Sequence, residues 1–456
     1  MALSSRRRTR MVVIENFGSC NMRCSYCFPE HMWSRQGHSA VMSKDTLRGT
    51  LEVAFDTPET GPVDVRFAGG EPLLAGRDWL ETAFAITREV AGRHGKRFTL
   101  SLQTNATLVT PELARLLAEH DVRIGVSLDG DASINEATRG DTDRTLAGFH
   151  RLTEAYGHVP GVIVTVTRAN ATRMHEVVGY LDSLGVALFR ANQMGATASW
   201  NVALAPRAEE WAAARQALIE EMAARAGQIM ELNLSQAVLK LVSSLFGGQS
   251  PFASPRGCCA MRCPAGTELL YFDRKGGAYP CPRTNVTATG KVAGYADTDF
   301  DARWDEMLGE LDTAMEVPGT CAACPANVVC DYGCHAFNVA EGNFFEVNCD
   351  ATKAFFGWMM EHPEQLARVF LLSQRRAEQR ARGDWNSPRA APLPNAAVST
   401  LAGDIGTRLL DHLARPDLNP DLLPQRFGWH EDRVPLLQIT RRRLGAPPSP
   451  SPLEGK

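Results

Sequence analysis

Cysteines occur in only two regions of this chain, and that distribution limits its possible folds more than any other feature of the sequence. Three of the twelve, Cys20, Cys24 and Cys27, lie in the stretch GSCNMRCSYCFPE, and none occurs between residues 28 and 257. The other nine follow within one later stretch: Cys258, Cys259, Cys263, Cys281, Cys321, Cys324, Cys330, Cys334 and Cys349. The pattern indicates two regions of cysteine chemistry that flank a cysteine-free body.

Charge and hydropathy narrow the setting in which these cysteines work. The net charge of −4 gives no general attraction to nucleic acid or to anionic membranes. No uninterrupted apolar run approaches about 18 residues, and the N-terminus is a poor signal peptide. We therefore expect a cytoplasmic protein that binds neither nucleic acid nor membrane. Disulfides are rare in the cytoplasm, so twelve cysteines there point to metal or redox chemistry.

Between the two cysteine regions, short apolar runs alternate with segments of helical periodicity. The segment 171–185 is one of the latter, and it ends at Gly185, a residue type that often stops helices. Strands that alternate with helices indicate parallel βαβ units. Six such runs predict an α/β fold with a partial (β/α)6 TIM-like barrel, although an open doubly wound sheet gives the same pattern. The expected strands are residues 11–16, 63–68, 98–104, 122–128, 161–167 and 186–192.

Polar residues and glycines gather at the ends of these expected strands, which is where ligands bind in both folds. The cysteine loop follows the first strand. The next three strands lead to Gly69, Gly70, Glu71 and Pro72, then Gln103, Thr104 and Asn105, then Ser127 and Asp129. We expect these residues to share one rim of the barrel, with Gln103, Asn105 and Asp129 as catalytic candidates.

The three N-terminal cysteines are one ligand short of a closed tetrahedral metal site. Taken alone, this stretch allows a Cys3His zinc site in which His31 is the fourth ligand. It also allows an iron–sulfur cluster with one open iron, because such clusters normally take four cysteine ligands. The motifs at the later strand ends favour the open cluster.

The motif Cys20-x3-Cys24-x2-Cys27, with Tyr26 before the last cysteine and GGEP after the next strand, resembles the radical S-adenosylmethionine (SAM) enzymes. The VSLDG element and Arg139 resemble the branch that contains peptide-modifying and sulfatase-maturing enzymes. The resemblance covers roughly residues 10–195. It implies a [4Fe–4S] cluster whose open iron binds SAM, and a 5′-deoxyadenosyl radical that abstracts a substrate hydrogen.

The same resemblance implies which residues bind SAM: Tyr26, Gly69, Gly70, Glu71, Ser127 and Arg139. Tyr26 would contact the adenine, and Gly70 would offer its backbone to the methionine amino group, because glycine permits close approach. Ser127 and Arg139 would bind the ribose and carboxylate end, whereas Glu71 would orient the turn.

The later cysteines, with Gly276 between Cys263 and Cys281, resemble the SPASM domain, which holds auxiliary clusters in many peptide-modifying radical SAM enzymes. Isolated CxxC pairs also suit a zinc ribbon. Two closed clusters need eight cysteines, so Cys258 or Cys259 joins the seven-cysteine pattern. The resemblance implies one cluster on Cys258 (or Cys259), Cys263, Cys281 and Cys334, and another on Cys321, Cys324, Cys330 and Cys349. With SAM, the expected cofactors are three [4Fe–4S] clusters.

Four parts follow along the chain. We expect a radical SAM core at 1–205, a helical linker at 206–255, a SPASM domain at 256–355 and a mainly helical C-terminal extension at 356–456. Within the extension, residues 355–383 and 398–415 have helical patterns, and the proline-rich tail is expected to be disordered.

Closed auxiliary clusters leave no site for substrate, which suits electron transfer and a net oxidation. We expect a maturase that crosslinks a ribosomally made precursor peptide, supplied with electrons by a flavodoxin- or ferredoxin-type reductase. Sulfatase-maturing enzymes have an Asp after the cysteine that corresponds to Cys281, whereas this chain has Pro282. Formylglycine formation is therefore the second choice, followed by dehydrogenation or epimerisation. The contrasting class is an iron–sulfur electron carrier, which would need no SAM pocket.

Overall fold

A computed structural model gives the architecture of most of the chain. It describes residues 7–27, 41–194, 202–247, 264–283, 291–314, 319–330, 346–381, 393–419 and 422–423. No helix in these ranges is both long and apolar enough to cross a membrane.

Ten strands form one sheet, in the order β10-β9-β8-β1-β2-β3-β4-β5-β6-β7. The six predicted strands are all present, and each pairs in parallel with the next along the chain. The predicted parallel α/β fold is therefore confirmed. The bounds are β1 (Met11–Phe17), β2 (Val63–Gly69), β3 (Phe98–Thr104), β4 (Arg123–Ser127), β5 (Gly161–Val166) and β6 (Leu188–Gln193). A short β7 (Met230–Glu231) continues the parallel pairing beyond β6.

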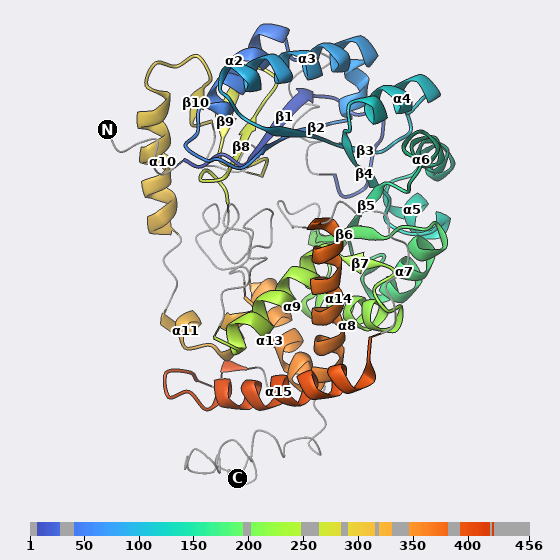
Figure 1. Cartoon of the computed structure of the whole chain (residues 1–456), viewed down its shortest axis with the longest axis vertical. Coiled ribbons are helices and arrows are strands. Elements are labelled where there is room, and N and C mark those ends of the chain that lie inside the picture. Colours follow the sequence, from blue (N-terminus) through green and yellow to red (C-terminus); the bar gives the residue numbers. More distant parts are fainter. Residues whose placement is uncertain are drawn as a thin grey trace.

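Helices cover the outer side of this sheet, which curves into the arc of a partial barrel (Figure 1). Local sequence explains where they start and stop: Ser43 caps the first and Thr110 the third, and Gly185 follows the last with a φ of +78°. Their apolar faces pack on alternate strand residues such as Val12 and Phe67. They are α2 (Lys44–Phe55), α3 (Arg77–Arg93), α4 (Pro111–Glu119), α5 (Ala132–Thr138), α6 (Thr142–Tyr156) and α7 (Met174–Ser183), with η1 (Pro72–Ala75) and η2 (Ala171–Arg173).

Three strands from the later cysteine region extend the other edge of the sheet. The strand β8 (Leu269–Phe272) pairs in parallel with β1, and β9 (Gly277–Tyr279) and β10 (Ala293–Gly294) follow in antiparallel pairing. The helix α10 (Phe300–Ala314) is fixed by Trp304, whose buried indole donates to the Gly266 carbonyl at 2.8 Å. With β8 on one side and β2 on the other, β1 is an interior strand of the sheet.

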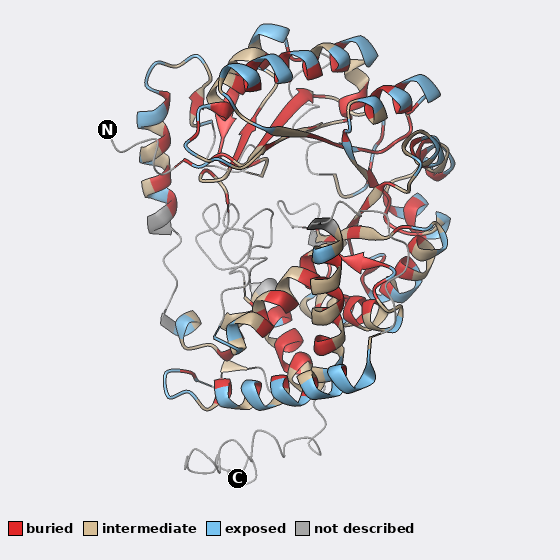
Figure 2. Cartoon of the chain, viewed as in Figure 1, coloured by how far each residue is buried: buried red, intermediate tan, exposed pale blue. Residues whose placement is uncertain are grey.

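The remaining helices form a body below the barrel (Figure 1). In it α13 packs on α8, α14 on α8 and α9, and α15 on α14. The predicted helical stretch 355–383 is divided between α13 and α14, and Pro363 begins the second. Figure 2 shows that α15 has an exposed outer side and a buried inner side. The elements are η3 (Val202–Leu204), α8 (Ala208–Ala224), α9 (Leu232–Leu245), α11 (Gly319–Ala322), η5 (Pro325–Val328), α13 (Glu346–Glu361), α14 (Pro363–Ala381) and α15 (Asn395–Leu413).

Candidate active site

The cysteine loop that follows β1 lies directly against the GGEP turn that follows β2. A Cβ on Gly70 would overlap the carbonyl group of Ser19, and Gly69 has a φ of +126°, so both positions require glycine. The Glu71 amide donates to the Ser19 carbonyl at 2.9 Å. The turn therefore fixes the backbone immediately before Cys20.

The Glu71 carboxylate is buried and bonds inside the protein. Its Oε1 accepts from the Leu73 amide at 3.0 Å and from the Thr104 hydroxyl at 2.8 Å. Its Oε2 accepts from the Asn105 amide at 2.8 Å. Burial raises the pKa of Glu71 to about 7, although these hydrogen bonds oppose the shift. These contacts support a role in orienting the turn.

Asn105 connects the end of β3 to the cysteine loop. Its Nδ2 donates to Asn21 Oδ1 at 3.0 Å and lies 3.7 Å from Cys20 Sγ. Its Oδ1 accepts from the Thr107 amide at 3.0 Å, and the side chain is buried. Burial also raises the pKa of Cys20. The contacts of this catalytic candidate support positioning of the loop.

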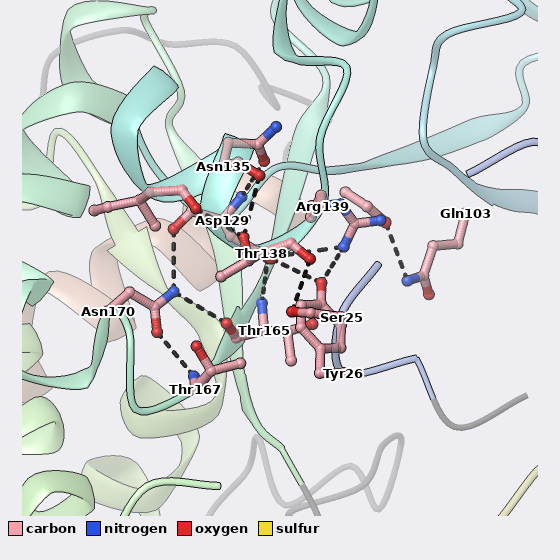
Figure 3. Close-up of polar contacts among 12 residues, drawn as sticks. Ser25, Tyr26, Gln103, Asp129, Asn135, Thr138, Arg139, Thr165, Thr167 and Asn170 are labelled. Atoms are coloured by element: carbon pink, nitrogen blue, oxygen red, sulfur yellow. Dashed lines mark hydrogen bonds and ion pairs between the residues drawn. The ribbon is translucent and has the colours of Figure 1, made fainter. Parts of the chain in front are cut away.

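The side chains of Tyr26, Asp129 and Arg139 meet in one polar cluster (Figure 3). The Tyr26 hydroxyl donates to Asp129 Oδ2 at 2.7 Å and accepts a bond from Arg139 Nη1, which lies 3.8 Å from Asp129 Oδ1. Asp129 is fully buried. Burial raises the pKa of Tyr26 well above its usual value, so the phenol remains protonated at neutral pH. Asp129 thus ties the cysteine loop to the end of β4.

Residues that the sequence reading missed complete this network. The Asp129 carboxylate accepts from the Thr165 amide at 2.8 Å, and the Asn170 side chain donates to the Asp129 carbonyl at 3.2 Å (Figure 3). Ser25 of the cysteine loop donates through its amide to the Thr138 carbonyl at 2.8 Å. Thr165 lies near the end of the predicted fifth strand and Asn170 three residues beyond it, so their position at a strand end is the signal that marks them.

Ser127 and Gln103 form a second polar pair at this rim. Gln103 Nε2 lies 3.4 Å from the Ser127 hydroxyl, at the limit of a weak hydrogen bond. Ser127 is buried, whereas Gln103 is exposed. Of the three catalytic candidates, Gln103 is the one whose side chain is free to contact a ligand.

The donor set suits the cofactors of a radical SAM site. Cys20 and Cys24 interact electrostatically, and Arg139 interacts with Cys24 and Cys27. Arg139 Nε is buried without a hydrogen-bond partner, an orphan donor that suits a ligand carboxylate. Among the described residues, no three His, Cys, Asp or Glu side chains are gathered closely enough to hold a metal ion.

Five of the later cysteines lie in the described ranges: Cys281, Cys321, Cys324, Cys330 and Cys349. Cys349 interacts electrostatically with Cys321 and Cys324, which were assigned to the same cluster. Cys281 lies two residues after the end of β9, apart from that group in the chain. Cys258, Cys259, Cys263 and Cys334 lie outside the described residues, and so does the alternative zinc ligand His31.

Fold and site together agree with a radical SAM protein. Residues 16–181 match the Radical SAM superfamily, so this part of the chain is similar to that superfamily. This class binds SAM and a [4Fe–4S] cluster.

Two relatives are similar to different shares of the chain. An uncharacterised protein of Methanothermobacter thermautotrophicus is 33% identical over 172 residues, which cover 37% of this chain and 62% of that protein. A serine-type anaerobic sulfatase-maturating enzyme of Klebsiella aerogenes is 24% identical over 349 residues, covering 71% of this chain and 79% of the enzyme. The first match thus spans less than two thirds of its relative.

Solved structures share the fold at low sequence identity. Native anSMEcpe with bound AdoMet and Cp18Cys peptide has a TM-score of 0.64 at 19% identity, covering 80% of this chain and 99% of that chain. SuiB of Streptococcus suis bound to precursor peptide SuiA has a TM-score of 0.54 at 15% identity, covering 75% of this chain and 76% of that chain. These likenesses confirm the partial-barrel fold.

Proposed function

We propose that this protein is a radical SAM peptide maturase. It would abstract hydrogen from a residue of a ribosomally synthesised precursor peptide and leave an oxidative intramolecular crosslink, carbon–carbon or carbon–heteroatom. The observation that carries the proposal is the network that joins the cysteine loop to the ends of β2, β3 and β4 through Glu71, Asn105 and Asp129. An electron carrier would have no need to fix that loop against a second ligand-binding turn.

The residues of the site would divide the work as follows. Cys20, Cys24 and Cys27 would hold the cluster, and the Arg139 guanidinium would bind the SAM carboxylate. When bound, cluster and SAM supply a 5′-deoxyadenosyl radical. Tyr26 is held by Asp129 in a fixed orientation, which suits contact with the adenine. Gln103 is exposed at the same rim and would contact the substrate.

The later cysteine region, residues 256–355, is here called the auxiliary module, and it would accept the electron that the oxidised peptide gives up. The proposal places one closed [4Fe–4S] cluster on Cys258 or Cys259 with Cys263, Cys281 and Cys334, and the other on Cys321, Cys324, Cys330 and Cys349. The electrostatic coupling of Cys349 to Cys321 and Cys324 supports the second set. A flavodoxin- or ferredoxin-type reductase would supply the starting electron.

Anaerobic reconstitution tests the enzyme class. Protein loaded with about twelve irons should release 5′-deoxyadenosine when dithionite and SAM are added. A fully loaded protein that releases none, with or without substrate, would disprove the proposal. Co-expression with a short peptide encoded beside this gene tests the reaction. A mass loss of about two units, with no fragmentation between the joined residues, is expected for a crosslink.

Sulfatase maturation is the second candidate, because the Klebsiella aerogenes enzyme matches most of the chain. Against it stands Pro282, which cannot act as a base after Cys281. The two candidates are separated by offering the reconstituted protein a sulfatase peptide with Cys or Ser at the target position. Appearance of an aldehyde in that peptide would favour the sulfatase alternative.

A further inference from the structure

A buried acidic residue of β1 binds side chains of the auxiliary module. Glu15 lies two residues before the end of β1, and its side chain is 5% exposed. The Tyr271 hydroxyl of β8 donates to Glu15 Oε2, and Arg274 Nη1 lies 3.4 Å from Glu15 Oε1. Burial raises the pKa of Glu15 despite these contacts. No motif in the sequence indicated this pairing across more than 250 residues of chain.

On its other side, Glu15 packs under both backbone segments that form the SAM site. A Cβ on Gly18, at the start of the cysteine loop, would lie 3.2 Å from Glu15 Oε1 and 2.7 Å from Arg274 Nη1. A Cβ on Gly69, in the GGEP turn, would lie 2.8 Å from Glu15 Cγ. The Glu15 side chain therefore packs tightly against both the cysteine loop and the GGEP turn.

Tyr271 in turn leads to a proposed ligand of an auxiliary cluster. Its ring lies 5.7 Å from the ring of Tyr279, which is paired with it across β8 and β9. Tyr279 is two residues before Cys281, and Val13, Tyr271, Tyr279 and Cys281 share one small buried cluster. A continuous series of packed side chains thus runs from the cysteine loop to Cys281.

We propose that Glu15 is a positioning residue that couples the hairpin formed by β8 and β9 to the SAM site. Held by Tyr271 and Arg274, its carboxylate fixes the cysteine loop and the GGEP turn in the arrangement that receives SAM. The inference rests on the proposed function for the identity of the ligand. In physical terms, the Tyr271 hydroxyl of the auxiliary module keeps residues 18–27 ordered.

Two tyrosines of the hairpin provide a matched test. Tyr271→Phe removes the hydroxyl that binds Glu15 and leaves the ring in place. Tyr279→Phe removes a hydroxyl that donates to Asp273 Oδ2 at 3.0 Å, a bond confined to the hairpin. Both variants keep the aromatic packing, so a difference between them reports the contact with Glu15 and not loss of the hairpin fold. Glu15→Gln, which keeps an acceptor for Tyr271 but no charge for Arg274, should fall between Tyr271→Phe and the parent.

The first measurement is hydrogen exchange of the reconstituted proteins. Amides of residues 18–27 should exchange about tenfold faster in Tyr271→Phe than in the parent, as expected when a buried bond to a charged group is lost. In Tyr279→Phe they should exchange at the parental rate. Equal exchange at these residues in both variants would overturn the proposal.

The second measurement is the change that SAM makes in the electron paramagnetic resonance spectrum of the reduced protein. Tyr271→Phe should raise the SAM concentration needed for half of that change about tenfold, while Tyr279→Phe leaves it unaltered. A parent protein with no SAM-induced change would refute the proposed function, whereas the exchange result would still decide whether Glu15 positions the loop. The same half-saturating concentration in all variants would show that Glu15 is only a structural brace.

Discussion

The two cysteine regions are held in place by different parts of the molecule. The N-terminal loop takes its position from the barrel: Glu71 binds the Ser19 carbonyl, Asn105 reaches Cys20 and Asn21, and the Ser25 amide binds the end of α5. All of these partners come from the ends of parallel strands or from the helix that follows β4. These contacts from the barrel act on the loop together with Glu15, which Tyr271 of the later region holds.

The later cysteine region is held in place by helices that contribute few reactive side chains. His412 near the end of α15 donates through Nε2 to the Pro325 carbonyl at 2.9 Å, and the Asn419 amide donates to Ala323 at 2.7 Å. Lys240 of α9 donates to the Cys330 carbonyl at 3.2 Å. The C-terminal extension therefore has a structural task, which is to fasten the segment that contains Cys321, Cys324 and Cys330.

The largest effects should separate the two regions chemically. Cys24→Ala should reduce 5′-deoxyadenosine to background and remove about four irons per chain, because one cluster loses a thiolate ligand. Cys324→Ala should keep SAM cleavage and lose the net product. Both variants are checked by iron analysis and by chromatography of the nucleoside. Loss of all iron from Cys24→Ala would contradict separate cluster sites.

A pair of buried carboxylates tests the mechanical independence of the regions. Glu71 and Glu231 each accept three hydrogen bonds, Glu71 in the GGEP turn and Glu231 at the start of α9. Glu71→Ala and Glu231→Ala should each lower the free energy of unfolding by roughly 3 kcal/mol, because buried donors lose their partners. Chemical denaturation measures this.

Their local effects should differ. In Glu71→Ala, faster hydrogen exchange should be confined to residues 18–27 and 98–107, and in Glu231→Ala to α9 and the segment 319–330. Spread of either effect through both regions would mean that the two are one cooperative unit.

Acid should act on the two regions in opposite directions. The pKa of Glu71 is raised by burial to about 7, so its folded state binds extra protons, and its contribution to stability is lost as pH rises toward 7. The pKa of His412 is lowered by burial, so its contribution is present above its ordinary pKa and lost as pH falls below it.

Between about pH 7.5 and 5.5, the cluster-free protein should therefore gain hydrogen-exchange protection at residues 98–107 and lose it at 319–330. Glu71→Gln should flatten the first response and His412→Gln the second. Parallel responses of both segments in the parent would show that other groups dominate the pH dependence.

The smallest effect concerns a single lysine. Lys240→Met should cost about 1 kcal/mol, the usual net value of one hydrogen bond, while keeping the apolar stem of the side chain. Thermal unfolding is the measurement, and exchange of the Cys330 segment should show where the stability is lost. No change in either would show that the bond to Cys330 contributes nothing to that region.

Local sequence signals predicted the barrel and the N-terminal site well. All six strands were found from apolar β-branched runs, and Gly70 and Glu71 were placed beside the cysteine loop from motif order. Both succeed because parallel strands place their carboxyl ends together, so proximity follows from topology. The same reasoning applies to Thr165 near the end of β5 and to Asn170 four residues after that strand, both of which contact Asp129.

Contacts between distant segments had no such signal. The pairing of β8 with β1, the bond from Tyr271 to Glu15 and the packing of α15 on α14 depend on which faces meet after folding. The buried carboxylates illustrate the limit, because the same residue type at a strand end serves as a positioning group or as a catalytic one. Asp129 was proposed as a catalyst, and its contacts tie Tyr26 and the Thr165 amide together.

The interior position of β1 matters while the chain is being synthesised, because the two partners of this strand are made at very different times. The strand leaves the ribosome first and β2 follows soon after, but β8, its second partner, comes about 250 residues later. At about 5–20 residues per second, one edge of β1 stays unpaired for roughly 10–50 s. A fragment that ends before residue 264 contains every motif proposed for the SAM site. It still exposes that edge of β1, and an exposed strand edge promotes aggregation.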